Sequence, residues 1–194
     1  MLFRSKLKIN EVRKDGLSYK NLVVGSLVLG RVTAITGRDV ALALPNNLTG
    51  FAPILSISER LTSRIERLLA SDEKPEEEED EDVDLKQLFY VGQWLRASIT
   101  AMGTEPKDGS RSKKHIELSL DPLSVNGALG VEDVVTNSTT QAAVRSVEDH
   151  GIVMDLGLAD SSIKGFISKK ALGSAYSLEQ IQEGQVLQIG RAHV

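Results

Sequence analysis

Apolar and small residues recur at fixed offsets along the chain and mark a repeated strand. Counted from Gly25, they occupy offsets +3, +5, +7 and +10. The same offsets hold from Gly92 and from Asn137, and from Gly184 they hold as far as Ile189. Alternation with a period of two predicts strands with one buried face. The break between +7 and +10 predicts a β-bulge that bends each strand, as a small closed barrel requires.

The segments that follow these starts divide the chain into two repeating units. After Gly25 and after Asn137 come an alternating strand and then a Gly-Phe pair. After Gly92 come a turn-rich segment and a final strand at 114–120. Each unit is therefore expected to contain five strands. The two units start 112 residues apart, and a repeat of this length predicts tandem domains rather than a solenoid.

A short helix is expected between the third and fourth strands of each unit. In the first unit Ser58 is a suitable N-cap, and Leu61 and Leu68 follow on one helical face. In the second unit, residues 169–182 are long enough for a small helix. Because the repeat fails at Arg191, we expect the second unit to lack its fifth strand and part of its fourth.

The predicted fold is thus all-β, with two tandem five-stranded barrels, each carrying a short helix between strands three and four, and with the second barrel incomplete at the C-terminus. The connector between the barrels is short, so we expect the two units to touch. The predicted boundaries are a basic leader at 1–20, a first barrel at 21–123 with an acidic disordered insertion at 71–84, a connector at 124–135, and a second, truncated barrel at 136–194.

Charge is concentrated in the insertion. The whole chain carries a net charge of −4 and the segment 71–84 carries −9, so the remaining residues carry +5. This balance permits a polyanionic partner. The insertion is either a solvated loop, because its like charges repel, or an attachment point for basic protein tails. The leader at 1–20 is either solvated or a basic arm for a nucleic-acid backbone.

Several classes of function are disfavoured by composition. The chain has no cysteine, and its three histidines lie far apart, so we expect no metal site. It has no glycine-rich phosphate loop and no local catalytic motif, so we expect no enzymatic activity, no cofactor and no small-molecule substrate. No apolar segment is long enough for a bilayer, and the basic N-terminus lacks the apolar block of a signal peptide. We therefore expect no membrane partner.

Seven segments, in the correct order twice over, resemble the S1 RNA-binding domain, an oligonucleotide-binding (OB-fold) barrel. The acidic insertion and the junction KKHIELSLDPLSVN further resemble the N-terminal repeats of the nucleolar multi-S1-repeat proteins of ribosomal RNA biogenesis. The matching segments are VVGSLVLGRVTAI, LTGFAPILSIS, VGQWLRASITAM and HIELSLDP in the first unit, and AAVRSVEDHGIVMDLG, KGFIS and EGQVLQI in the second.

The resemblance implies a non-catalytic RNA-binding scaffold for pre-ribosomal RNA processing. The implied partners are the ribosomal RNA precursor, single-stranded or structured, and other assembly proteins of the pre-ribosomal particle. The implied location is the nucleolus. The alternative is a protein-docking or spacer module of the same assembly, with little RNA binding of its own.

The candidate RNA contacts are mostly basic side chains. Typical members of the fold stack bases on outward aromatic residues of strands two and three, but the outward positions of strand two here are Asp39, Ala41 and Ala43. We expect Phe51 and Phe166 to pack rather than to stack, so the stacking platform should be largely missing. The basic hairpin is either a solvated tip or a phosphate contact, and His150 either caps a turn or contacts a base. The candidates are Arg31, Arg38, Arg96, Lys107, Arg111, Lys113, Lys114, His115 and His150.

Overall fold

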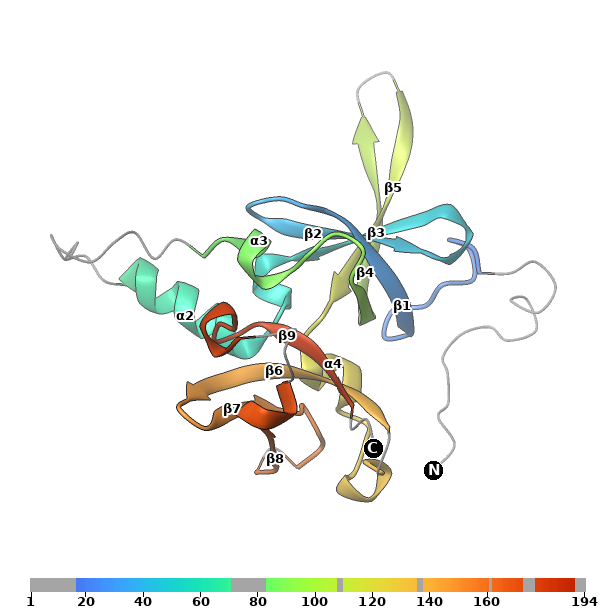
Figure 1. The fold of residues 1–194 in the computed structure, drawn as a ribbon. Helices are drawn as coiled ribbons and strands as arrows, with labels where there is room; N and C mark the ends of the chain where they lie inside the picture. The colour runs from blue at the N-terminus through green and yellow to red at the C-terminus, as the bar shows by residue number, and fades with distance from the viewer. Residues whose placement is uncertain are drawn as a thin grey trace, which may run out of the picture.

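The computed structural model describes residues 17–70, 83–107, 110–135, 138–160, 162–172 and 177–190. In the outer part of the β4–β5 hairpin, only the backbone is described for residues 104–107 and 110–113. The described chain forms a closed barrel and, beside it, an open sheet (Figure 1).

The first unit is a closed barrel of five strands in the order β1-β2-β3-β5-β4. A parallel pairing between β3 and β5, which joins Phe51 to Glu117, closes the barrel. The prediction of an all-β fold with a five-stranded barrel is therefore confirmed for this unit. Its strands are β1 (Leu27–Ile35), β2 (Asp39–Leu44), β3 (Leu48–Pro53), β4 (Trp94–Lys107) and β5 (Ser110–Ser119).

The barrel interior follows the predicted alternation. Val32, Leu42, Leu95 and Leu118 are fully buried because they lie on the inward positions of their strands. Gly50 also faces inward, and a Cβ atom there would lie 2.5 Å from the Leu118 side chain. Glycine is therefore needed at this position for Leu118 to fill the barrel.

Helices cover the barrel where the sequence predicts one. Ser58 caps α2 (Glu59–Ala70), since its hydroxyl oxygen accepts a hydrogen bond from the backbone N–H of Leu61 at 3.2 Å. A second, short helix, α3 (Leu85–Leu88), begins after Asp84, whose carboxylate accepts a hydrogen bond from the backbone N–H of Lys86. Asp84 is therefore part of the fold, although most of the predicted acidic insertion lies outside the described residues.

The second unit is a four-stranded sheet in the order β8-β7-β6-β9. No described strand joins β8 to β9, so this unit is half of a barrel. In place of one small helix predicted at 169–182, the described residues form two short 3₁₀ helices, Lys169–Leu172 and Leu178–Gln180. The strands are β6 (Thr139–Glu148), β7 (Gly151–Asp155), β8 (Lys164–Ser168) and β9 (Val186–Gly190).

The two units share local backbone geometry. Bulges interrupt β1 between Val32 and Ala34 and β6 between Val144 and Ser146, at the predicted break in alternation. Val32 exchanges backbone hydrogen bonds with Gly92 and Gln93, and Val144 does the same with Gly184 and Gln185. The repeated sequence pattern thus produces the same strand bend twice.

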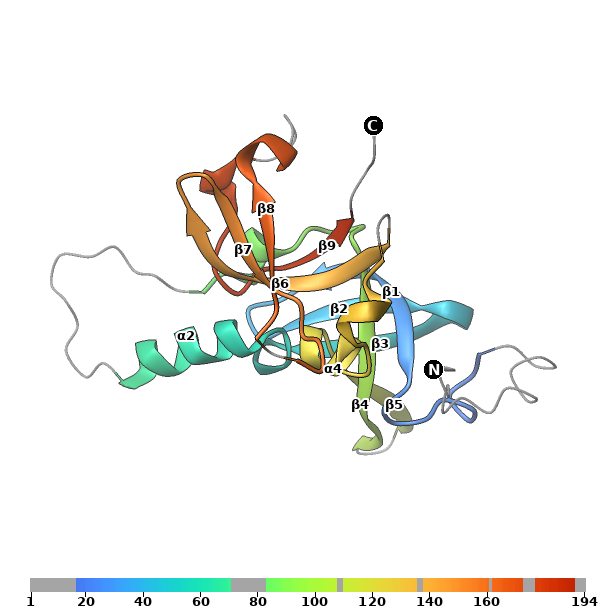
Figure 2. The same cartoon turned by 90° about the horizontal axis from the view of Figure 1, so that it is seen from below.

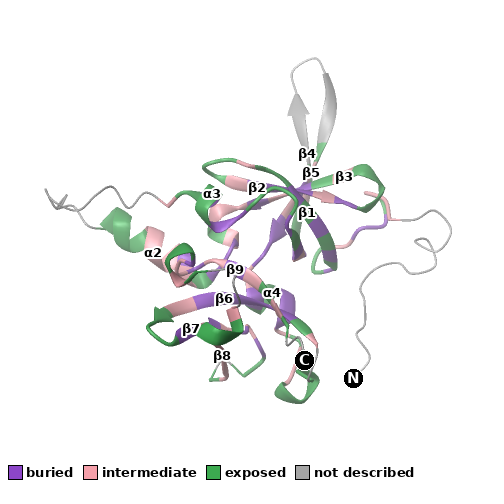
Figure 3. Ribbon diagram, viewed as in Figure 1, coloured by how far each residue is buried: buried purple, intermediate pink, exposed green. Residues whose placement is uncertain are grey.

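The connector packs between the two units. It begins with α4 (Pro122–Asn126), which lies against β4 and β6, and continues through a 3₁₀ turn at Val131–Asp133. Figure 1 shows α4 between the barrel and the sheet, and Figure 2 shows the same elements from below. Figure 3 shows that buried residues line α4 and β6 as well as the barrel strands. The prediction that the units touch is confirmed.

Buried amides hold this joint together. The side-chain carbonyl of Gln141 accepts a hydrogen bond from the backbone N–H of Arg96 at 2.9 Å, and its amide group donates to the backbone carbonyls of Arg96 and Leu120 at 2.9 Å each. The amide group of Asn126 donates to the carbonyls of Gln141 and Leu156. Gln141 and Asn126 are both fully buried. Removing either side chain would leave buried backbone groups unpaired, which is costly.

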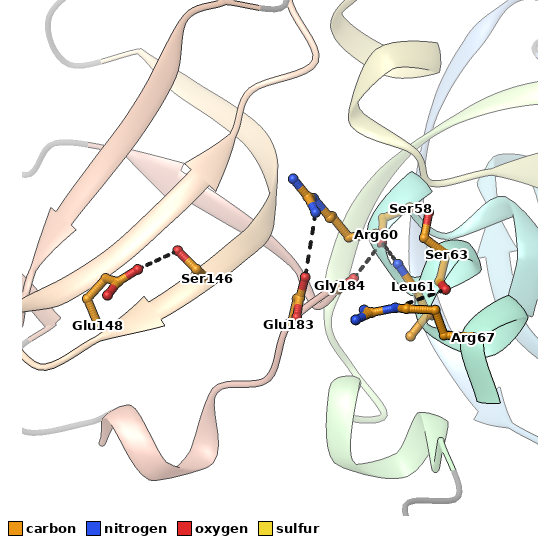
Figure 4. Close-up of polar contacts among 9 residues, drawn as sticks. All are labelled: Ser58, Arg60, Leu61, Ser63, Arg67, Ser146, Glu148, Glu183 and Gly184. Carbon is orange, nitrogen blue, oxygen red and sulfur yellow. Dashed lines mark hydrogen bonds and ion pairs between the residues drawn. The ribbon is translucent and has the colours of Figure 1, made fainter. Parts of the chain in front are cut away.

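Helix α2 contributes the other half of the joint (Figure 4). The Ser58 hydroxyl donates to the backbone carbonyl of Gly184 at 2.7 Å, and Arg60 forms an ion pair with Glu183 at 3.8 Å. Gly184 has a φ of +86°, and a Cβ atom there would lie 2.9 Å from atoms of Leu61. Glycine therefore permits both the turn and the close approach of α2.

Candidate nucleic-acid interface

The predicted basic hairpin is present and extends away from the barrel (Figure 1). It is formed by the outer parts of β4 and β5, which pair from Ser98 with Ser119 out to Lys107 with Ser110. Lys107, Arg111 and Lys113 lie on these strands, but their side chains fall outside the described residues.

A stacked ring pair lies on the outer surface where β3 and β5 meet. The rings of Phe51 and His115 have centroids 5.4 Å apart and planes inclined by only 8°. Both residues are half-buried, so part of each side chain is open to solvent. Face-to-face rings at this distance form a platform of the kind on which a nucleobase can stack.

A cation–π pair lies on the opposite face of β5, since Lys114 alternates with His115 along the strand. The Lys114 ammonium lies 5.1 Å from the centroid of the Tyr19 ring, a cation–π geometry. The Tyr19 hydroxyl donates to the backbone carbonyl of Gly103 on β4 at 2.7 Å, which fixes the ring beside the hairpin. Leu17 and Tyr19 also pack against the barrel core, so residues before the predicted start at 21 contribute to the barrel's packing. Phe51 and His115 together are called the β3–β5 ring cluster below.

The position of Phe51 corrects the expectation that this ring packs inward. Gly50 and Ala52 occupy the inward positions of β3, and both are buried. Phe51 must therefore face outward, opposite Ala41 of β2. Phe166 faces outward in the same register, opposite Val153, and is 60% exposed. Outward rings are thus present on β3 and β5, whereas the outward positions of β2 carry none.

The other predicted contacts lie elsewhere on the molecule. Arg38 and His150 are exposed in the β1–β2 and β6–β7 turns, and their backbone carbonyls accept equivalent hydrogen bonds from Ile54 and Lys169. They correspond to each other in the two units. The local geometry therefore gives His150 a turn role, and its exposed ring remains available for contact.

The two arginines of β1 and β4 are not part of the ring cluster. Arg31 is exposed on β1, next to Trp94 of β4. Arg96 lies on the same face, but its guanidinium donates to the backbone carbonyl of Thr139 at 2.9 Å. Arg96 therefore joins the two units rather than facing a free groove.

The seam between the units contains a cavity of about 310 Å³ lined by side chains of both charges. Lys164 and Asp155 form an ion pair there at 3.2 Å. Burial raises the pKa of Asp121 above its ordinary value of 3.8, a backbone hydrogen bond from Leu123 opposes this, and the Glu59 and Asp155 carboxylates raise the pKa further. The mixture of charges gives this cavity no preference for phosphate.

The described residues hold neither a metal centre nor a membrane span. No group of three or more histidine, aspartate or glutamate side chains is placed to hold a metal ion among them. No helix in that part of the chain has the length and apolar character needed to span a membrane.

Comparison with known proteins gives relatives over most of the chain. No family model matches it. It is 45% identical over 166 residues to "rRNA biogenesis protein rrp5" of Schizosaccharomyces pombe, which covers 82% of this chain and 10% of that protein. It is 27% identical over 175 residues to "Protein RRP5 homolog" of Homo sapiens, covering 90% of this chain and 9% of that protein.

Among solved structures, the chain is similar to one described as the a/eIF2alpha-aDim2p-rRNA complex from Pyrococcus horikoshii OT3. The TM-score is 0.33 and the sequence identity is 16%, over 58% of this chain and 48% of that chain. The chain spans about a tenth of the length of the curated relatives. Over 82–90% of its own length, the chain is therefore similar to a segment of proteins named RRP5.

Proposed function

We propose that this chain is a non-catalytic RNA-binding segment of a scaffold for ribosomal RNA biogenesis. The observation that carries this proposal is the 45% identity, over 82% of the chain, to a protein named for rRNA biogenesis. Its ligand would be precursor ribosomal RNA, its other partners would be assembly proteins of the same particle, and its location would be the nucleolus.

The β3–β5 ring cluster supports this proposal as the contact surface. Phe51 and His115 offer stacked rings, and stacking contributes about 1–3 kcal/mol per base in proteins that bind single strands. The hairpin sequence next to His115 contains Arg111, Lys113 and Lys114, whose positive charge would attract the phosphates of the same strand. Proteins that bind single-stranded nucleic acid commonly combine aromatic rings with positive charge.

The test is fluorescence anisotropy of the full chain with a single-stranded oligonucleotide of precursor ribosomal RNA across a salt series. We expect the double variant Lys113→Ala/Lys114→Ala to bind more weakly. The slope of log affinity against log salt should become shallower by about 0.7 for each lysine–phosphate pair that the substitutions remove. The matched control is Lys169→Ala/Lys170→Ala, which removes two exposed lysines from the second unit.

The stacking component needs a separate variant. Phe51→Leu keeps an apolar side chain on β3 but removes the ring, and we expect roughly a tenfold or greater decrease in affinity with little change in the salt slope. Thr49→Ala, on the same face of the same strand, is its control. If the folded wild-type chain fails to bind RNA at low salt, or if both lysine pairs reduce affinity equally, the proposed function of this surface is wrong.

A further inference from the structure

The outer face of β1 and β4 is apolar where alternation normally places polar residues. On β1 the outward positions are Leu27, Leu29 and Arg31, and Leu27 and Leu29 are 42% and 48% exposed. On β4 the outward Trp94 is 55% exposed, so α2 does not cover it. Large apolar side chains grouped on a surface mark interaction sites more often than single ones do.

These side chains are neighbours by strand register. Trp94 is the direct cross-strand partner of Arg31, and Arg96 is the partner of Leu29. Leu29 is therefore diagonal to Trp94, a separation that an aromatic side chain can span. We call Leu27, Leu29, Arg31 and Trp94 the β1–β4 strip.

The strip continues the surface that the second unit already covers. Arg96, next to Leu29, is held by Gln141 and Thr139 of the second unit. Ser98, the partner of Leu27, is outward on β4 yet only 7% exposed. The second unit thus contacts this face of the barrel at Arg96, and Trp94 of β4 and the outward leucines of β1 remain exposed.

The charge of the strip restricts what can cover the open part. Arg31 is exposed, and the segments 27–31 and 94–98 contain no acidic residue. A second copy of this face would bring Arg31 toward a like charge, which is unfavourable. Leu27 and Leu29, half of the strip, offer a phosphate backbone neither charge nor a hydrogen-bond donor, so only Arg31 and Trp94 could contact RNA here. The complementary occupant is a protein segment with apolar side chains for the strip and carboxylates for Arg31.

We propose that the β1–β4 strip is a docking site for an acidic, apolar segment of another protein. Trp94 and Arg31 would contribute most of the affinity, because tryptophan and arginine dominate such interfaces. This surface is distinct from the β3–β5 ring cluster, so a chain bound to RNA through that cluster can dock a protein at the same time.

The test is a peptide-display selection on the full chain, followed by titration of the enriched synthetic peptides. Trp94 is the only tryptophan, so its emission reports the strip directly. We expect enriched peptides to combine leucine or phenylalanine with aspartate or glutamate, and to shift Trp94 emission to shorter wavelength on binding. Leu29→Asp should weaken binding of the enriched peptides at least tenfold. A selection repeated on Arg31→Glu should enrich peptides with fewer aspartate and glutamate residues.

Controls separate this site from others and from unfolding. Leu55→Asp replaces a leucine outside the strip that is 59% exposed and should leave binding unchanged. Circular dichroism establishes that each variant is folded. Enriched peptides that bind Leu29→Asp as well as the wild type would overturn the proposal, as would enriched peptides rich in lysine. An RNA oligonucleotide that shifts Trp94 emission and displaces the peptides would assign the strip to RNA instead.

Discussion

The closed barrel and the open sheet begin from the same sequence pattern and exclude solvent in different ways. In the barrel, β5 pairs with β3 and β4, and the interior is enclosed by the unit's own strands. In the second unit, β6 has one face on its own core and the other on the first unit, where Ala143 joins the barrel's cluster together with Val186 of β9. The bulges and turn hydrogen bonds are local properties of the pattern, whereas closure depends on a distant strand.

The same contrast appears in the two outward phenylalanines. Phe51 is half-buried because β5 runs beside it and brings His115 against the ring. Phe166 occupies the corresponding position but is 60% exposed, since no described strand runs along the outer edge of β8. The fifth strand thus closes the barrel and also supports the ring cluster.

The largest expected effect comes from the core of the open sheet. Met154 is fully buried there, and Met154→Ala should lower the free energy of unfolding by about 2–5 kcal/mol. If the joint couples the units, the Trp94 fluorescence transition of the barrel will move to lower denaturant together with the circular dichroism signal. Val153→Ala, on the outward side of the same strand, is the control. A Trp94 transition left at its wild-type midpoint would show that the units unfold independently.

The joint itself should be nearly as sensitive. Gln141→Leu leaves the backbone N–H and carbonyl of Arg96 and the carbonyl of Leu120 without their partner, and we expect a destabilisation of about 3 kcal/mol. Chemical denaturation measures it. Gln188, the cross-strand partner of Gln141, is exposed, so Gln188→Leu should change stability by less than about 0.5 kcal/mol. Equal effects of the two changes would contradict the role assigned to the joint.

The phenylalanine pair provides a smaller effect. Phe51→Ala removes a half-buried ring stacked on His115 and should cost about 1–2 kcal/mol. Phe166→Ala removes a mainly exposed ring and should cost less than about 0.5 kcal/mol. Thermal denaturation of both variants tests the difference, and a larger destabilisation for Phe166 would mean that the open sheet relies on this ring.

The smallest effect concerns pH. Because the pKa of Asp121 is raised in the folded chain, the folded state binds its proton more tightly than the unfolded state does. Ionisation of Asp121 therefore reduces stability as the pH rises from 3.8 through the raised value. Asp121→Asn should be more stable than the wild type at neutral pH, and this advantage should vanish below pH 3.8. If Asp121→Asn were more stable than the wild type by the same amount at every pH, ionisation of Asp121 would not be the cause.

Local patterns predict much of this structure, and distant contacts account for what they miss. Alternation and its single break are sufficient for the strands, bulges and core. These patterns do not predict the direction of Phe51. Phe51 faces outward because Gly50 faces inward, where it leaves room for Leu118, a residue far along the chain. Gln141 cannot be recognised either, since a polar residue beside the buried Ala142 is normally solvated, and here the first unit covers it.

The shared core also has a consequence for the order of folding. Ala143 and Val186 are buried by contact with residues of the first unit. The open sheet can complete this part of its packing only on a barrel that is already formed. Domains generally fold as units from the N-terminus during synthesis, and the barrel precedes the sheet in the chain. During synthesis the barrel therefore leaves the ribosome before the open sheet, which packs against it.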